Sequence, residues 1–391
     1  MKQISGGVCA ATGFSASGVH CGIRKNKTKR DLALIYSTVP ASAAAVYTTN
    51  LVKGAPLVVT KQHLADGKAQ AIICNSGNAN TCNANGIEIA EQMSALLGQA
   101  LHISPSDVVV ASTGVIGQPL DIAPIAAGIP ELVNCLGPHS DEAAEGIMTT
   151  DTKRKEIAVS FTVGGKACKI GGICKGSGMI HPNMATMLVY VTTDAKADPA
   201  DLQKMLSAAV DKSFNMCTVD GDTSTNDSIF LLANGASGVE IKTEEDKKAM
   251  ADLVLAICTD MARRVASDGE GATHLIEVEA YGLPTEHDAR LVAKSIAGSM
   301  LFKAAVFGRD ANWGRIMAAA GYSGADVDPT RADCIIKSAA GEVQVMKDGF
   351  GADFSEELAK KVLTEHDITV IVRFYQGDGE AKAWGCDLTY D

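Results

Sequence analysis

Helical and strand-like patterns alternate along the whole chain, and this alternation limits the possible folds more than any other feature. Apolar residues recur at helical spacing over 87–100 and 249–265, with Thr243 as a candidate N-cap before the second helix. Apolar and β-branched runs predict strands at Leu32–Tyr36, Ala71–Cys74, Val108–Ala111, Leu188–Val191, Ile276–Val278 and Val370–Phe374. A chain of 391 residues exceeds the usual size of one core, so we expect an α/β or α+β protein of at least two domains, with Gly282–His287 as the best candidate joint.

The acidic balance of the chain restricts its partners. A formal net charge of −11 argues against binding to the phosphate backbone of nucleic acids, which requires a basic surface. No apolar run reaches the roughly 20 residues of a membrane-spanning helix, and the first residues lack the apolar segment of a signal peptide. We therefore expect a cytoplasmic protein with neither nucleic-acid nor membrane partners.

Cysteine and histidine spacing gives no sign of a metal site. The eleven cysteines include no Cys-x-x-Cys pair, and no His-Glu-x-x-His motif occurs. We expect reduced, buried cysteines and no bound metal. The basic cluster from Arg24 to Arg30 lies between two strand-like runs, which favours a solvated hairpin loop over an anion site.

Two loops rich in small residues follow predicted strands, where binding and catalytic groups are often found. Asn75–Thr81 is rich in residues that tolerate left-handed backbone angles, and it fits either a functional loop or an ordinary tight turn. Ser112-Thr113-Gly114 follows Val108–Ala111 directly. A hydroxyl and a backbone N–H at such a strand end can point to one spot and form an oxyanion hole, although many such pairs are simple turns.

The segment Lys175–Tyr190 is the most informative stretch. It differs from a phosphate-binding P-loop because Lys175 precedes the glycines and the segment leads into a strand, not a helix. A loop containing glycine and proline instead delivers Ala185-Thr186 to a strand. If the peptide bond before Thr186 is cut, the freed α-amine, with a pKa of about 8, can take the proton of the Thr186 hydroxyl and so activate it as a nucleophile. The alternative is a β-branched residue that merely enters a strand.

Two further loops carry charged side chains. Glu270 lies between two glycines in Asp268–His274, after a predicted helix and before a predicted strand, which favours an exposed position at a cleft. The stretch Gly308–Ile316 holds two arginines, an acid and Trp313. It fits either a clamp for a substrate carboxylate or an internal network between Arg309 and Asp310.

Taken together, these segments resemble the ornithine acetyltransferase family of arginine biosynthesis, also called the bifunctional glutamate N-acetyltransferase family. The resemblance covers nearly the whole chain. It is carried by Asn75–Asn80, Ser112–Gly114, Met148–Thr152, Lys175–Ile180, Pro182–Leu188, Asp220–Asp227, Asp268–Thr273, Gly308–Asp310 and Asn312–Arg315. A single motif of this kind is weak evidence, but the ordered set is specific.

The resemblance implies a self-processing fold like that of N-terminal-nucleophile hydrolases, a layered α/β sandwich with a smaller C-terminal α/β domain at about 283–391. The chain is expected to cut itself between Ala185 and Thr186 into an α chain (1–185) and a β chain (186–391), which stay together, as a heterotetramer. Members usually continue beyond the equivalent of Cys386–Asp391 with a short tail that brings an Asn and a Thr to the substrate, and this sequence stops at Asp391.

By the same resemblance, Thr186 takes the acetyl group of N-acetylornithine and passes it to glutamate, while Thr113 and Gly114 hold the oxyanion. Thr149, Lys175, Thr186 and Glu270 match the family's substrate contacts. No cofactor is implied, and acetyl-CoA is a possible second donor. Two alternatives remain: an N-terminal-threonine amidohydrolase or aminopeptidase that uses water as acceptor, and a non-catalytic binding protein that keeps the fold.

Overall fold

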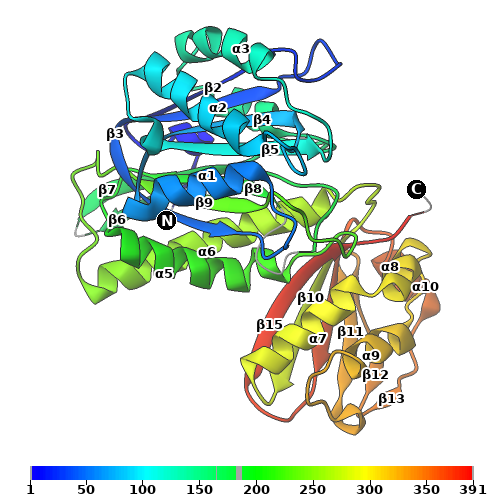
Figure 1. Ribbon diagram of the computed structural model, residues 1–391. Coiled ribbons are helices and arrows are strands. Elements are labelled where there is room, and N and C mark those ends of the chain that lie inside the picture. The colour runs from blue at the N-terminus through cyan, green and yellow to red at the C-terminus, as the bar shows by residue number, and fades with distance from the viewer. Residues whose placement is uncertain (1, 164, 182–186, 390–391) are drawn as a thin grey trace. The chain divides into compact units, whose positions relative to one another are not determined.

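The computed structural model describes residues 2–163, 165–181 and 187–389 (Figure 1). They form two compact units. Unit 1 comprises the described parts of Met1–Gly176, Asn183–Asp211 and Thr223–Met261, and unit 2 those of Ser177–Pro182, Lys212–Asp222 and Ala262–Asp391. Each unit therefore contains segments from both sides of the predicted cleavage point.

A mixed sheet is the centre of unit 1, with nine strands in the described residues. These are β1 (Lys2–Ile4), β2 (Phe14–Val19), β3 (Leu32–Tyr47), β4 (Lys68–Asn78), β5 (Val108–Val115), β6 (Lys155–Val163), β7 (Lys166–Lys175), β8 (Leu188–Thr193) and β9 (Ser228–Ala233). The order is β1-β6-β7-β8-β9-β3-β4-β5, and β2 pairs with β3. The pairs β4–β5 and β8–β9 are parallel, and the other neighbours are antiparallel.

Both faces of this sheet are buried along its central strands. On β4, Ile72 and Cys74 join one apolar cluster, whereas Ala71 and Ile73 join another, because successive side chains of a strand point to opposite faces. Helices cover both sides: α1 (Ala55–His63), α2 (Gly86–Leu101) and α3 (Ile122–Asn134) pack near the β3–β5 region, and α4 (Ser140–Ile147) packs on β2 and β3. The result is a layered α/β arrangement.

Two more helices belong mainly to unit 1. They are α5 (Pro199–Lys212) and α6 (Glu244–Ser267), and an ion pair of 3.1 Å between Lys247 and Asp201 joins them. Thr243 caps α6, since its hydroxyl oxygen accepts a hydrogen bond of 3.1 Å from the N–H of Asp246. The predicted N-cap is thus confirmed.

Unit 2 is built on a second sheet, with six strands in the described residues. They are β10 (Leu275–Leu283), β11 (Asp333–Ser338), β12 (Gly341–Lys347), β13 (Phe350–Gly351), β14 (Asp367–Arg373) and β15 (Gly379–Cys386). The order is β13-β12-β11-β14-β10-β15. Its helices are α7 (Glu286–Gly298), α8 (Met300–Phe307), α9 (Trp313–Gly321) and α10 (Glu356–Val362), and α7 packs on β10 and β15.

The predicted α/β class is confirmed, and each of the six predicted strands falls in an observed strand, apart from Phe374, which follows the end of β14. The joint expected at Gly282–His287 is not where the units divide. That stretch connects β10 to α7 inside unit 2, where α7 folds back onto β10. In the part of the chain that the structure describes, no helix has both the length and the apolar character needed to cross a bilayer.

Candidate active site

Thr113 and Gly114 lie at the end of β5, beside the equivalent end of β4. The parallel register pairs Ser76 with Thr113 and Gly77 with Gly114. Gly114 has φ +133°, and a Cβ at this position would collide with the backbone of Gly77, so only glycine fits. The close approach of the two strand ends fixes the direction of the backbone next to the Thr113 hydroxyl.

Lys175, the last residue of β7, reaches this strand end. Its Nζ donates to Thr113 Oγ1 at 3.3 Å, and the two side chains are each 8% exposed. Because the Thr113 oxygen accepts this hydrogen bond, its own O–H proton remains available to donate to another group. The structure thus brings together the predicted oxyanion residue Thr113 and the predicted substrate contact Lys175.

Asp151 links several parts of the same region. Its carboxylate accepts hydrogen bonds from Lys155 Nζ at 2.7 Å, from the N–H of Gly176 at 2.8 Å and from the N–H of Thr149 at 3.0 Å. Burial by itself raises the pKa of Asp151, but the ammonium groups of Lys155 and Lys175 and these hydrogen bonds outweigh it and lower the pKa to about 2. Asp151 is therefore an anion at neutral pH, and it ties half-buried Thr149 to the end of β7.

The asparagine-rich segment Asn75–Thr81, predicted as a loop, begins inside β4, which ends at Asn78, and the hydrogen bonds around it brace the ends of β4 and β5. Asn226 Nδ2 donates to the carbonyl oxygens of Ala79 and Ser112 at 2.5 and 2.9 Å, and Asn75 Oδ1 accepts from the Ser112 hydroxyl at 2.6 Å. Asn226 comes from the Asp220–Asp227 motif, which lies far away in the sequence. These hydrogen bonds hold the strand end that carries Thr113.

The basic segment between β2 and β3 is a hairpin loop, as predicted, because β2 and β3 pair antiparallel. It is not fully solvated, however. The guanidinium of Arg24 is half-buried and donates to the carbonyl oxygen of Met148, next to Thr149. Arg30 forms ion pairs of 2.8 and 2.6 Å with Glu142 and Glu145 on α4.

Ala185 and Thr186, the predicted cleavage site and nucleophile, lie outside the described residues. The strand that follows is observed as expected: β8 begins at Leu188, and the carbonyl oxygen of Met187 accepts from the N–H of Ser228 at 3.0 Å. A strand, and not a helix, therefore follows the glycine-rich segment, in agreement with the argument against a P-loop.

Glu270 belongs to unit 2, on the turn between α6 and β10. It is exposed, as predicted, and its carboxylate lies against Gly178, where a Cβ would meet Oε2. The N–H of Glu270 donates to the carbonyl oxygen of Ser177 at 3.1 Å, and the Ser177 hydroxyl donates to that of Asp268 at 2.8 Å. The glycine-rich segment after β7 thus holds the Glu270 turn in place.

A pocket of about 260 Å³ in unit 2 has Glu270 in its wall. We call it the Lys303 pocket, after the buried lysine that shares this wall. Its lining consists of Val219, Asp220, Gly221, Glu270, Gly298, Met300, Lys303, Cys386, Asp387, Leu388 and Thr389. Charged groups of both signs therefore face one small space.

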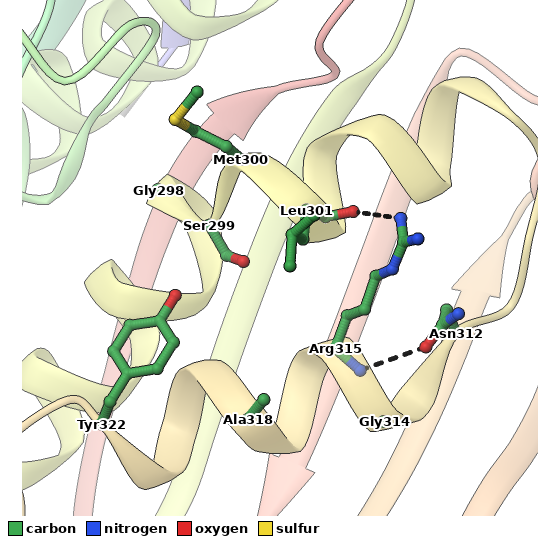
Figure 2. Close-up of a pocket in the computed structure, with 9 residues that line it drawn as sticks. All are labelled: Gly298, Ser299, Met300, Leu301, Asn312, Gly314, Arg315, Ala318 and Tyr322. Carbon is green, nitrogen blue, oxygen red and sulfur yellow. Dashed lines mark hydrogen bonds between the residues drawn. The ribbon is translucent and has the colours of Figure 1, made fainter.

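In the described residues, the stretch Gly308–Ile316 shows no hydrogen bond or ion pair between the side chains of Arg309 and Asp310, so the predicted internal network is not observed. Figure 2 shows that Arg315 reaches across to α8, where Nη1 donates to the carbonyl oxygen of Leu301 at 2.7 Å. Asn312 caps α9 and also donates to Asp310 at 2.9 Å. The pocket drawn there, of about 460 Å³, is lined mainly by small and apolar residues, with Arg315 as its one charged residue.

Sequence reasoning missed three charged residues that shape these sites: Asp151 as a hub, its partner Lys155, and Lys303. The four-residue spacing of Asp151 and Lys155 was a possible signal for the first two. All eleven cysteines are free, as predicted; seven are buried, but Cys82 and Cys135 are exposed. Among the described residues, no group of three or more His, Cys, Asp or Glu side chains is arranged to hold a metal ion.

Comparison with known proteins gives matches over nearly the whole chain. The model of the ArgJ family matches residues 15–391. The arginine biosynthesis bifunctional protein ArgJ of Symbiobacterium thermophilum is 49% identical, over 100% of this chain and 98% of that protein. The protein of the same name from Bacillus subtilis is 45% identical, over 100% of this chain and 95% of that protein.

A solved structure is also similar. It is the crystal structure of the arginine biosynthesis bifunctional protein argJ from Bacillus halodurans, with 46% identity and a TM-score of 0.50. The match covers 53% of this chain and 96% of that chain. The crystallised polypeptide is thus much shorter than the chain described here.

Proposed function

The chain belongs to the ArgJ family, and from this premise we propose that it moves an acetyl group from N2-acetyl-L-ornithine to L-glutamate through an acetyl ester of Thr186. The products are L-ornithine and N-acetyl-L-glutamate. The observation that carries the proposal is the buried contact of 3.3 Å between Lys175 Nζ and Thr113 Oγ1. The next residue, Gly114, has no room for a side chain.

In the first half-reaction, the α-amine of Thr186 takes the hydroxyl proton while the oxygen attacks the acetyl carbonyl of N-acetylornithine. The tetrahedral oxyanion is held by the Thr113 hydroxyl and the N–H of Gly114. The C–N bond then breaks, and ornithine leaves with the proton. Lys175 supports this step by donating to Thr113 Oγ1, which leaves the O–H of Thr113 free to donate to the oxyanion.

In the second half-reaction, the amine of glutamate attacks the ester. The α-amine of Thr186 takes the proton that the amine of glutamate loses and passes it to the Thr186 oxygen as the C–O bond breaks, and N-acetylglutamate leaves. Water in place of glutamate would make the enzyme an amidohydrolase. Both half-reactions use one oxyanion site, which fits a ping-pong cycle.

Self-cleavage between Ala185 and Thr186 is part of the proposal, because only a free α-amine makes Thr186 its own base. One observation supports it. The similar crystallised chain aligns with 53% of this sequence, and a cut before Thr186 would leave residues 186–391, about the same share of 391 residues. We further propose that the two products remain associated, because each unit contains segments from both sides of the cut. The heterotetramer is proposed from the resemblance to the family alone.

Among the substrate contacts, we assign Lys175 to a substrate carboxylate and Glu270 to the side-chain ammonium of ornithine, and we keep Thr149 as a further substrate contact. The word bifunctional in the names of the relatives favours acetyl-CoA as a second donor. Formation of N-acetylglutamate from acetyl-CoA and glutamate, without N-acetylornithine, tests that second activity.

The main activity is tested by incubating purified protein with N-acetylornithine and glutamate and by measuring N-acetylglutamate, ornithine and acetate. We expect one N-acetylglutamate for each ornithine and little acetate. Acetate equal to ornithine, with no N-acetylglutamate, would instead assign the amidohydrolase. No product of either kind would favour the non-catalytic binding protein.

A further inference from the structure

One buried ammonium group of unit 2 makes a single hydrogen bond to the residues that the structure describes. Lys303, on α8, is 3% exposed, and its Nζ donates to the carbonyl oxygen of Val219. Among the described residues this is its one side-chain hydrogen bond, and no carboxylate lies within ion-pair distance of it. An ammonium has three N–H donors, and burying it without partners is strongly unfavourable. A ligand anion in the Lys303 pocket would satisfy it.

Two carboxylates in the same pocket are occupied by other donors. Asp220 accepts from the N–H groups of Met179, Ile180 and Asp222. Asp387 accepts from the N–H groups of Thr273 and His274 and from both of their side chains. Both carboxylates thus accept hydrogen bonds from other groups and attract Lys303 only from beyond ion-pair distance.

Glu270 is the exception among these acids. Its carboxylate accepts no hydrogen bond from the residues that the structure describes, although its backbone N–H is bound to Ser177. The pocket therefore offers a ligand one under-used carboxylate and one under-used ammonium. Its volume of about 260 Å³ suits a molecule of amino-acid size rather than a larger ligand.

In a two-step transfer, one site must bind two substrates with opposite side-chain charges, and a pocket with one acid and one lysine can do so. In the proposed cycle, one site receives first ornithine, whose side chain ends in an ammonium, and then glutamate, whose side chain ends in a carboxylate. A site with a single charge would favour one substrate and repel the other. A site with both signs can hold each in turn.

We propose that Lys303 binds the side-chain carboxylate of glutamate in the Lys303 pocket, while Glu270 binds the side-chain ammonium of ornithine in the other half of the cycle. This inference rests on the proposed function. It makes Lys303 the residue that selects an acidic acceptor. No bond is made or broken at Lys303, so its effect belongs to binding of the second substrate.

The test is the variant Lys303→Met, which keeps the length of the side chain and removes the charge. With saturating N-acetylornithine, kcat/KM for glutamate should fall about 10- to 100-fold, as expected for loss of a charge-assisted hydrogen bond. Release of ornithine in the first turnover, measured without glutamate, should stay within about twofold. A kcat/KM for glutamate within twofold of wild type in folded Lys303→Met would overturn the proposal.

The preference for glutamate over glutamine as acceptor distinguishes recognition of the side-chain carboxylate by Lys303 from a merely structural role of Lys303. Wild type should prefer glutamate strongly, and Lys303→Met should lose most of this preference because the two acceptors differ in charge at the side-chain end. Lys361→Met is the matched control, since Lys361 is an exposed lysine of α10 paired with Glu357 at 2.8 Å, outside the pocket. It should keep both rates and the preference.

Two measurements cover the remaining outcomes. If Lys303→Met does not fold, Lys303→Arg is measured instead. A preserved preference for glutamate over glutamine supports the proposal. Loss of this preference with the first half-reaction unchanged contradicts the proposal that the positive charge selects glutamate. If wild type transfers no acetyl group, the proposed function fails. Calorimetry with glutamate on wild type and Lys303→Met then still tests Lys303, and equal affinities would refute its role.

Discussion

Unit 1 and unit 2 each bury a lysine almost completely, but they surround it differently. Lys155 in unit 1 is 2% exposed and pairs with Asp151 at 2.7 Å. Lys303 in unit 2 is 3% exposed and has only the carbonyl oxygen of Val219 as a side-chain partner in the described residues. Burial of a charge is unfavourable in both places, so the presence or absence of a paired carboxylate indicates what each lysine does. A buried charge with its own counter-ion holds the fold, whereas one without it is available to a ligand.

The same contrast separates the two sides of the proposed reaction. In unit 1, Asp151, Lys155 and Lys175 are neighbouring charges that fix the strand end with Thr113, and the Lys175 ammonium keeps further N–H donors for a substrate carboxylate. Such fixed groups suit transition-state stabilisation, which gains from donors that need no rearrangement. In unit 2, Glu270 and Lys303 are left to bind a substrate of either sign.

The largest effect on stability should follow from breaking the buried ion pair between Lys155 and Asp151. Lys155→Met leaves the Asp151 carboxylate buried without its main partner and should cost about 3–5 kcal/mol. Arg154→Met is the neighbouring control, because Arg154 is exposed and its pair with Asp141, at 3.1 Å, is worth about 0–1 kcal/mol. Urea denaturation of both variants measures the difference. Equal losses of unfolding free energy in the two variants would show that the buried pair contributes no more to stability than the exposed one.

The next largest effect concerns catalysis. Thr113→Ala removes the proposed oxyanion donor and should lower kcat about 10²- to 10³-fold, or roughly 3–4 kcal/mol. Thr113→Ser keeps the hydroxyl and should retain most of the activity. Acetyl transfer assays measure both, and cleavage before Thr186 should also be slower in Thr113→Ala. An alanine variant that turned over like wild type would exclude Thr113 from the oxyanion hole.

An acid-dependent loss of stability should follow from Asp151. Its pKa is about 2 in the folded state against 3.8 ordinarily, so its contribution is complete above pH 3.8 and is lost as pH falls toward 2. The shift amounts to about 2 kcal/mol. Unfolding free energies measured between about pH 5 and pH 2 should fall less steeply for Asp151→Asn than for wild type. Parallel curves for the two proteins would show that Asp151 does not titrate as described.

The smallest effect should be the stability change in Lys303→Met. Among the described residues, the Lys303 ammonium has no counter-ion within ion-pair distance, so its removal strands none of their carboxylates and the unfolding free energy should change by less than about 1 kcal/mol. This is the direct counterpart of Lys155→Met. A loss as large as that of Lys155→Met would mean that Lys303 holds the fold, and the contrast between the two units would disappear.

Patterns read along the chain predicted the α/β class, the strands and the start of α6, because periodicity and capping are local. They also placed Thr113 and Gly114 at a strand end. The domain boundary was not predictable in this way, since unit 2 gathers Lys212–Asp222 with residues after Ala262. The role of Lys303 depends on Val219, Asp220 and Asp387, which only the folded chain brings together.

The central claim, that Thr186 becomes an N-terminal nucleophile, is tested most directly by denaturing mass spectrometry of wild type beside Thr186→Ala. We predict two chains from wild type, residues 1–185 and 186–391, and one intact chain from the variant. An uncut wild type that still transfers the acetyl group would contradict this account, because Thr186 would then have no free α-amine to act as its base.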